Sequence, residues 1–212
     1  MNIIDRIFLL LTGLVAIFTI YTLITGNQSK KTVIYPIISL SVLTISGVLL
    51  IIFGWEILGL MGDGISNKLV AVVASLIPFA WAIGVVNHIN KKLGKIYLPI
   101  MILGVLLITI SRFSNSSEFA RIIYPVFHGL AGLTIVFLPL LTFKRAGLKL
   151  SYLLVSLGGL LISTGGMALS FIMADRQLLF FSADFVLMIL APLLFLTALA
   201  YGAGLIFGVK SE

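Results

Sequence analysis

Seven long apolar stretches follow one another along the chain and leave little sequence between them. A helix needs about 20 residues to cross a bilayer, and most of these stretches reach that length without an internal charge. Alternation with a period of two residues is absent, so membrane-spanning strands are excluded. The predicted spans are residues 7–26, 33–54, 69–90, 95–113, 121–143, 150–174 and 178–209, the fourth being the shortest.

The composition supports the same fold class. Of the 212 residues, 60% are hydrophobic and only 10% are charged, whereas a soluble domain carries about 25% charged residues. A water-soluble core of this size could not bury so much apolar surface. We therefore predict an all-α integral membrane protein, with residues 1–212 forming a single seven-helix transmembrane domain.

Basic residues gather in alternate connections. The loops after the first, third and fifth spans, together with the carboxyl-terminal tail, hold nine of them: Lys30, Lys31, Lys91, Lys92, Lys95, Lys144, Arg145, Lys149 and Lys210. The other loops mix basic with acidic residues. The positive-inside rule then predicts an amino terminus outside, a carboxyl terminus in the cytoplasm and insertion in the cell membrane. The net charge of +7 is interpreted as this topology signal, with no nucleic-acid partner.

Spans two, four and six each follow a basic loop and contain similar sequence segments, for instance residues 40–46, 103–109 and 157–163. This similarity favours three helical-hairpin repeats plus a seventh helix, although apolar helices also match one another by chance. Small residues recur four positions apart at Gly204 and Gly208 and at Gly159 and Ser163. We expect both pairs to pack helices closely inside one bundle rather than to form a dimer face.

Only two ionisable side chains lie well inside the spans, His128 and Asp184. Counted from Arg121 and Arg176, both are about 10 to 12 Å below the outer boundary. Tyr124 precedes His128 by one helical turn, so the sequence predicts a Tyr–His–Asp cluster for a ligand or a proton-linked site. Alternatively, Asp184 is hydrated or paired with Arg176, and His128 donates one structural hydrogen bond.

Two acidic residues, Glu56 and Asp63, flank the first outer loop and are candidates for the mouth of a cavity, or are simply solvated. No metal site is predicted, and the absence of cysteine excludes iron–sulfur clusters and thiolate zinc. His88 belongs at the inner boundary, too far in depth from His128 for a bis-histidine haem. No lysine lies deep in a span, so a retinal Schiff base is excluded. We predict no cofactor.

Three functions fit this sequence. The first is a non-catalytic sensory or accessory subunit, which binds an apolar or lipid-like ligand or a partner membrane protein. The second is a small secondary transporter, proton-linked through Asp184 and His128. The third is a membrane enzyme acting on lipid or isoprenoid, for which a catalytic constellation is hard to find. We favour the first, with membrane lipid, partner membrane proteins or a homo-oligomer as the expected partners.

Overall fold

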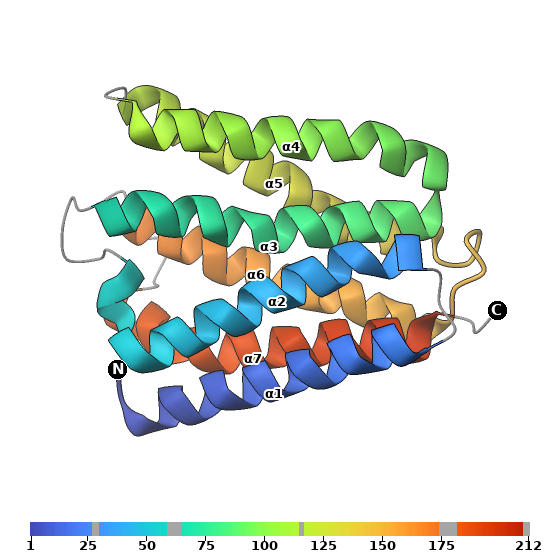
Figure 1. Ribbon diagram of the computed structural model, residues 1–212, viewed down its shortest axis with the longest axis horizontal. Helices are drawn as coiled ribbons and strands as arrows, with labels where there is room; N and C mark the ends of the chain where they lie inside the picture. Colours follow the sequence, from blue (N-terminus) through green and yellow to red (C-terminus); the bar gives the residue numbers. More distant parts are fainter. Residues whose placement is uncertain (27–29, 59–64, 115–116, 174–181, 210–212) are drawn as a thin grey trace.

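The computed structural model describes residues 1–26, 30–58, 65–114, 117–173 and 182–209, and this part of the chain is all-helical (Figure 1). Two short 3-10 helices, η1 (Trp55–Leu58) and η2 (Leu150–Tyr152), accompany seven long helices. These are α1 (Ile3–Thr25), α2 (Lys30–Phe53), α3 (Ile65–Ile89), α4 (Lys91–Phe113), α5 (Ser117–Thr142), α6 (Leu153–Met173) and α7 (Ala183–Gly208). All seven are long and apolar enough to cross a membrane, which confirms the predicted all-α class and the expected number of such helices within the described residues. Insertion in a membrane stays a prediction.

The limits of the helices differ from the predicted spans by up to five residues, and the starts of α4 and α7 show why. The fourth is not short, because α4 starts at Lys91 and runs for 23 residues. Asn90 caps it by accepting hydrogen bonds from the backbone N–H groups of Lys92 and Leu93, at 2.9 and 3.2 Å. The predicted seventh span began near residue 178, whereas α7 begins at Ala183 with Ser182 as its N-cap. In both cases the local cap, rather than the extent of the apolar run, sets where the helix starts.

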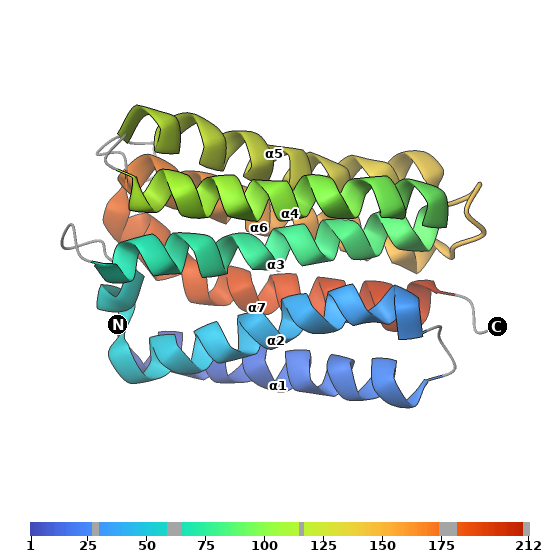
Figure 2. The same ribbon diagram turned by 45° about the horizontal axis from the view of Figure 1, so that its top comes forward.

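The helices form a closed bundle in chain order. Each packs against the next one, α7 returns to α1, and α3 in addition contacts α5 (Figures 1 and 2). Residues 78–86 of α3 are all buried, so this stretch is surrounded on every side. A helix that is apolar around its whole circumference is expected in such an interior position. The pairs α2–α3, α4–α5 and α6–α7 lie side by side, and their descent from a repeat stays a prediction.

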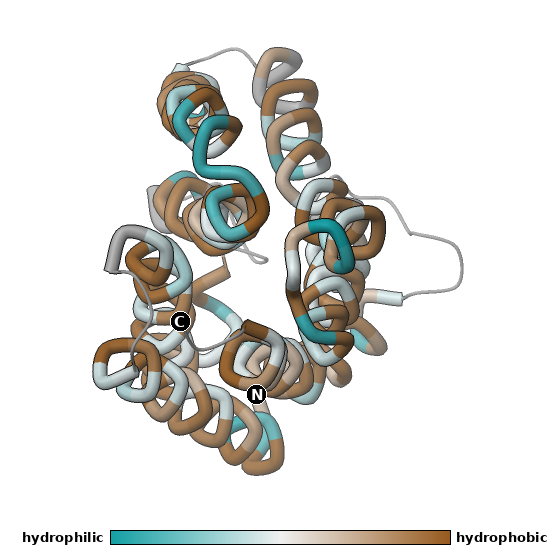
Figure 3. The backbone as a smooth tube through the Cα atoms, turned by 90° about the vertical axis from the view of Figure 1, so that its right-hand side faces the viewer, coloured by the Kyte–Doolittle hydropathy of each residue, from teal (hydrophilic) through white to brown (hydrophobic). Residues whose placement is uncertain are grey.

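The two ends of the bundle differ in charge. The carboxyl-terminal end of α7, the last turn of α1 and the connections α3–α4 and α5–α6 lie at one end, and the amino terminus lies at the other (Figure 1). We call these the basic end and the amino-terminal end. Helix α4 begins at the basic end with Lys91, Lys92 and Lys95, and the α5–α6 connection adds Lys144, Arg145 and Lys149 (Figure 3). The side of the membrane that each end faces stays a prediction.

The predicted small-residue pairs pack within the chain. A Cβ atom on Gly204 would lie 2.9 Å from the backbone nitrogen of Val155, and one on Gly208 would lie 2.5 Å from the Cα atom of Tyr152. Helix α7 therefore rests directly on the backbone of η2 and α6. On another face of α6, Gly159 lies against Ile135 of α5, and the Ser163 hydroxyl lies beside Gly132. Both pairs thus bring neighbouring helices of one bundle together.

We predict that Gly204→Ala destabilises the protein by about 1–3 kcal/mol, because its Cβ atom would press on backbone that cannot rotate away. Gly129→Ala is the matched control, since no atom lies within 4 Å of the position of its Cβ atom. Alanine favours a helix over glycine by about 1 kcal/mol, so this control should be neutral or stabilising. Thermal unfolding in detergent micelles measures both, and equal stability of the two variants would contradict the packing of α7 on α6.

Candidate functional site

The structure brings together two of the three residues of the predicted Tyr–His–Asp cluster. The rings of Tyr124 and His128, one turn apart on α5, stack with centroids 5.1 Å apart and an interplanar angle of 24°. The third residue beside this pair is Arg112 and not the predicted Asp184. Arg112, from the last turn of α4, places its guanidinium carbon 5.2 Å from the centroid of the Tyr124 ring. We call these three residues the Arg112 cluster, and it lies toward the amino-terminal end.

Asp184, the third predicted member, does not join Tyr124 and His128 in any contact among the described residues. It is exposed in the first turn of α7, and its carboxylate makes no hydrogen bond or ion pair with the described residues. The neighbouring Ser182 caps this helix through its hydroxyl, which accepts a hydrogen bond of 3.2 Å from the backbone N–H of Phe185. An acidic residue at a helix amino terminus interacts favourably with the helix dipole. The position of Asp184 is therefore explained by helix capping alone.

Of the two acidic residues predicted at the outer mouth of a cavity, the structure describes one. Glu56 is exposed on η1, beside Trp55, which turns inward and packs with Leu9 and Leu50. Asp63 lies outside the described residues. Within the described part of the chain, no three histidine, aspartate or glutamate side chains come together as they would around a metal ion.

A second set of polar side chains, which the sequence analysis did not assemble, lies in the core. It has six members, and each has a buried nitrogen or oxygen atom without a hydrogen-bond partner among the described residues: Trp81, His88, Tyr152, Ser156, Thr197 and Tyr201. We call them the core polar set. They come from three elements only, because α3, the η2–α6 segment and α7 each provide two. Four of the six atoms are hydroxyl oxygens, which both donate and accept hydrogen bonds.

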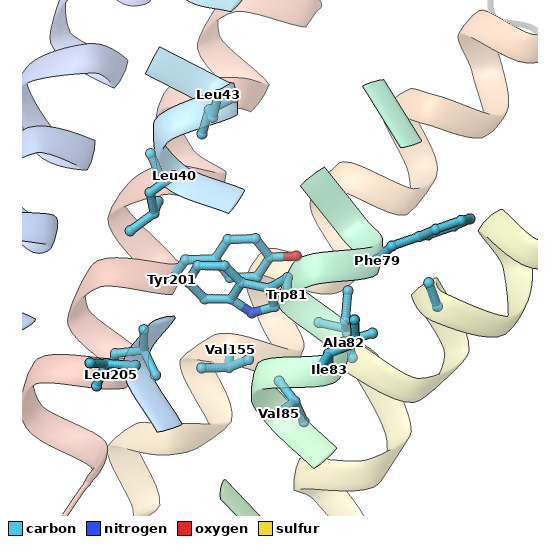
Figure 4. Packing of buried hydrophobic residues seen from close by; sticks show 14 of the residues in the cluster. Leu40, Leu43, Phe79, Trp81, Ala82, Ile83, Val85, Val155, Tyr201 and Leu205 are labelled. Carbon is cyan, nitrogen blue, oxygen red and sulfur yellow. The ribbon is translucent and has the colours of Figure 1, made fainter. Parts of the chain in front are cut away.

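At the centre of this set, Trp81 of α3 lies flat on Tyr201 of α7, with ring centroids 3.8 Å apart and an interplanar angle of 14° (Figure 4). Both side chains are only 1% exposed. A glycine makes room for the pair, since a Cβ atom on Gly158 of α6 would lie 2.5 Å from Cδ1 of Tyr201. The surroundings are apolar, with Leu40 and Val155 on either side of the stacked rings (Figure 4).

The set continues from this stack toward the basic end. The rings of His88 and Tyr152 are 5.9 Å apart and tilted by 33°. Ser156 lies one turn along from Tyr152, and Thr197 one turn from Tyr201. His88 and Trp81 are seven residues apart on α3, which corresponds to about 10 Å along the helix axis. The core polar set therefore extends from the basic end to the middle of the bundle.

The sequence does contain a signal for this set. Three polar pairs, Trp81 with His88, Tyr152 with Ser156, and Thr197 with Tyr201, have spacings of seven or four residues, so each pair shares one helical face. Taken alone, each pair is common in a membrane helix and does not predict the core polar set. Comparison with known proteins adds nothing further, because no protein-family model, curated protein or solved structure matches this chain.

We predict that the stack couples α3 to α7 energetically. In a double-mutant cycle of Trp81→Leu and Tyr201→Leu, the interaction term should be about 0.5–1.5 kcal/mol, as aromatic pairs contribute. Trp81→Leu combined with Tyr21→Leu serves as the control cycle, because Tyr21 of α1 is 65% exposed. In this control cycle, the effects of the two single substitutions on the free energy of unfolding should add. Unfolding in detergent gives both terms, and additive effects in the Trp81–Tyr201 cycle would show that the stack contributes nothing beyond burial.

Proposed function

We propose that this chain is a non-catalytic multi-pass membrane protein, a sensory or accessory subunit that binds an apolar ligand in the core polar set. The observation that carries the proposal is the gathering of six buried, unpartnered polar atoms on α3, the η2–α6 segment and α7. The proposed site lies in the half of the bundle nearer the basic end. By the positive-inside rule this is the cytoplasmic half of a protein in the cell membrane.

The energetic argument rests on the cost of leaving polar atoms unpaired. More than 90% of buried polar groups in proteins have a hydrogen-bond partner, and each one without a partner costs about 1–3 kcal/mol. Six such groups lie in the half of the bundle nearer the basic end, and a bound molecule with hydrogen-bonding groups would supply partners for some of them. The walls beside the stacked rings, formed by Leu40, Val155 and Leu205, are apolar. A ligand with an apolar body and one or two polar groups fits both features.

The chemistry of these side chains favours binding over catalysis. Indole N–H and unpaired hydroxyl groups hold and orient a ligand through hydrogen bonds. A hydroxyl nucleophile needs an adjacent base to activate it. His88 is the one member of the core polar set that could serve as a base, and its ring faces the ring of Tyr152. A sensory or accessory role therefore agrees best with the site.

A small secondary transporter is the second candidate. It is supported by the succession of polar atoms with depth, from His88 and Tyr152 at the basic end to Thr197, which lies eleven residues or about 16 Å before the end of α7. A proton-linked route through Asp184 and His128 has less support, because Asp184 is exposed at the amino-terminal end. Such a transporter would use the core polar set as the cytoplasmic half of its pathway.

The test begins with native mass spectrometry of the protein purified gently from its own membranes. We expect a retained small molecule in the wild-type protein and a marked loss of it from a Tyr201→Phe, Ser156→Ala double variant. Tyr21→Phe is the matched control, because this tyrosine is exposed. Retention of the molecule to the same extent in the double variant would contradict the site. A bare chain in every sample would contradict the binding function and leave transport, to be tested by uptake in liposomes.

Fluorescence gives an independent measurement of the same site. The chain has two tryptophans, so Trp55→Phe leaves Trp81 as the one indole reporter. Removal of the retained molecule by detergent exchange should change the emission of Trp81, because the ligand would contact its ring or its N–H group. Emission that does not change while the molecule is lost would place the ligand elsewhere.

A further inference from the structure

Arg112 is a cation whose charge has no counter-ion in the described structure. It is half-buried at the end of an apolar helix, and its Nε atom is fully buried without a hydrogen-bond partner among the described residues. A guanidinium group stays charged under all ordinary conditions. Placing such a charge in apolar surroundings is costly unless it is paired. The Tyr124 ring, 5.2 Å away, offsets part of this cost through a cation–π interaction.

Neither of the residues that accompany Arg112 in the cluster is a carboxylate. His128, which stacks on Tyr124, has a buried Nδ1 atom with no hydrogen-bond partner among the described residues. Lys68 of α3 carries another positive charge toward this end of the bundle, where its ammonium group lies 6.0 Å from the centroid of the Phe113 ring. The acidic residues described at this end are occupied or exposed. Asp5 forms a capping box with Asn2, and Glu56 and Asp184 point to solvent.

We propose that the Arg112 cluster binds an oxyanion, the phosphate or carboxylate group of a membrane lipid or of a small soluble anion. The Arg112 guanidinium would be the main donor, because its planar fork matches the geometry of both groups. The Tyr124 ring, 5.2 Å from the guanidinium carbon, helps to hold the guanidinium in position. This site is separate from the core polar set, since it lies toward the opposite end of the bundle and selects a charged group.

A purely structural role for Arg112 leads to different expectations. A cation in the last turn of a helix interacts favourably with the helix dipole, and this alone could explain its position. In that case its replacement would lower stability without changing the affinity for any anion. Arg6 provides a matched comparison, because it is also an arginine at the amino-terminal end but is exposed on α1.

The experiment uses the full chain in a neutral detergent, titrated in separate arms with dioleoyl phosphatidylglycerol, neutral dioleoylglycerol and inorganic phosphate. Native mass spectrometry or calorimetry measures the binding. We expect phosphatidylglycerol, inorganic phosphate or both to bind more tightly than dioleoylglycerol, and the stronger arm identifies the source of the oxyanion. Arg112→Gln should weaken this binding by about tenfold or more, as expected for a lost charge-assisted hydrogen bond. Arg6→Gln should leave it within about twofold of the wild type.

Arg112→Lys keeps the charge but loses the planar fork, and it serves as the second variant if Arg112→Gln does not fold. We expect a loss of affinity of about threefold or more for this variant, which is smaller than that of the Gln variant. Equal affinity of the wild type and both Arg112 variants would overturn the proposal, as would binding of neither anion. Glu118 is the acidic residue closest to Arg112 in the sequence. A large gain in affinity on Glu118→Gln would show that a carboxylate of the chain itself serves as the counter-ion, which also overturns it.

Discussion

Burial of α3 on every side is the constraint on which the rest of this bundle depends. Residues 78–86 are all buried, and α2, α4 and α5 pack against α3. Helix α3 also accepts a hydrogen bond from α2, in which the Ser39 hydroxyl donates to the carbonyl oxygen of Ile77 at 2.8 Å. This contact lies directly before Pro78. The polar atoms of such a central helix face the neighbouring helices. These polar atoms therefore determine what the interior can bind.

The interior of a membrane protein gains little from burying apolar groups, because the lipid outside is as apolar as the core. Close packing and hydrogen bonding must hold the helices together instead. Close packing is evident where α7 lies on the backbone of α6 at Gly204 and Gly208. Hydrogen bonding between helices is evident between Tyr97 of α4 and Thr134 of α5, whose oxygen atoms are 2.8 Å apart. Against this background, the unpartnered atoms of the core polar set are unlike the rest of the interior.

The sequence alone predicts the class and number of the helices, because both follow from apolar runs of membrane-spanning length. It also places Tyr124 and His128 on the same helical face, since residues four apart share one, and in the structure their rings stack. The membrane depth of Asp184, counted in the sequence from Arg176, stays a prediction, and the structure shows that Asp184 lies in the first turn of α7 after the cap at Ser182. The contact of Arg112 with Tyr124 joins two different helices, so it is visible in the structure alone.

The core polar set could not be assembled from the sequence for a physical reason. Each polar pair defines a face of its own helix, but only the tertiary packing decides which faces meet. Trp81 and Tyr201 are 120 positions apart in the sequence, and nothing local connects them. Within one helix, a tryptophan or a threonine is also an ordinary membrane residue. Gly158 permits a close approach of α6 to Tyr201 of α7, and Trp81 of α3 stacks on that same tyrosine.

The most direct test of this account is an experimental density map of the protein crystallised from a lipidic mesophase without prior delipidation. The account predicts density that belongs to no protein atom within hydrogen-bonding distance of the Tyr201 hydroxyl or the Trp81 indole nitrogen. It also predicts that this density is bounded by the apolar side chains of Leu40 and Val155. Well-ordered rings of Trp81 and Tyr201 without any such density beside their polar atoms would contradict the proposed binding site.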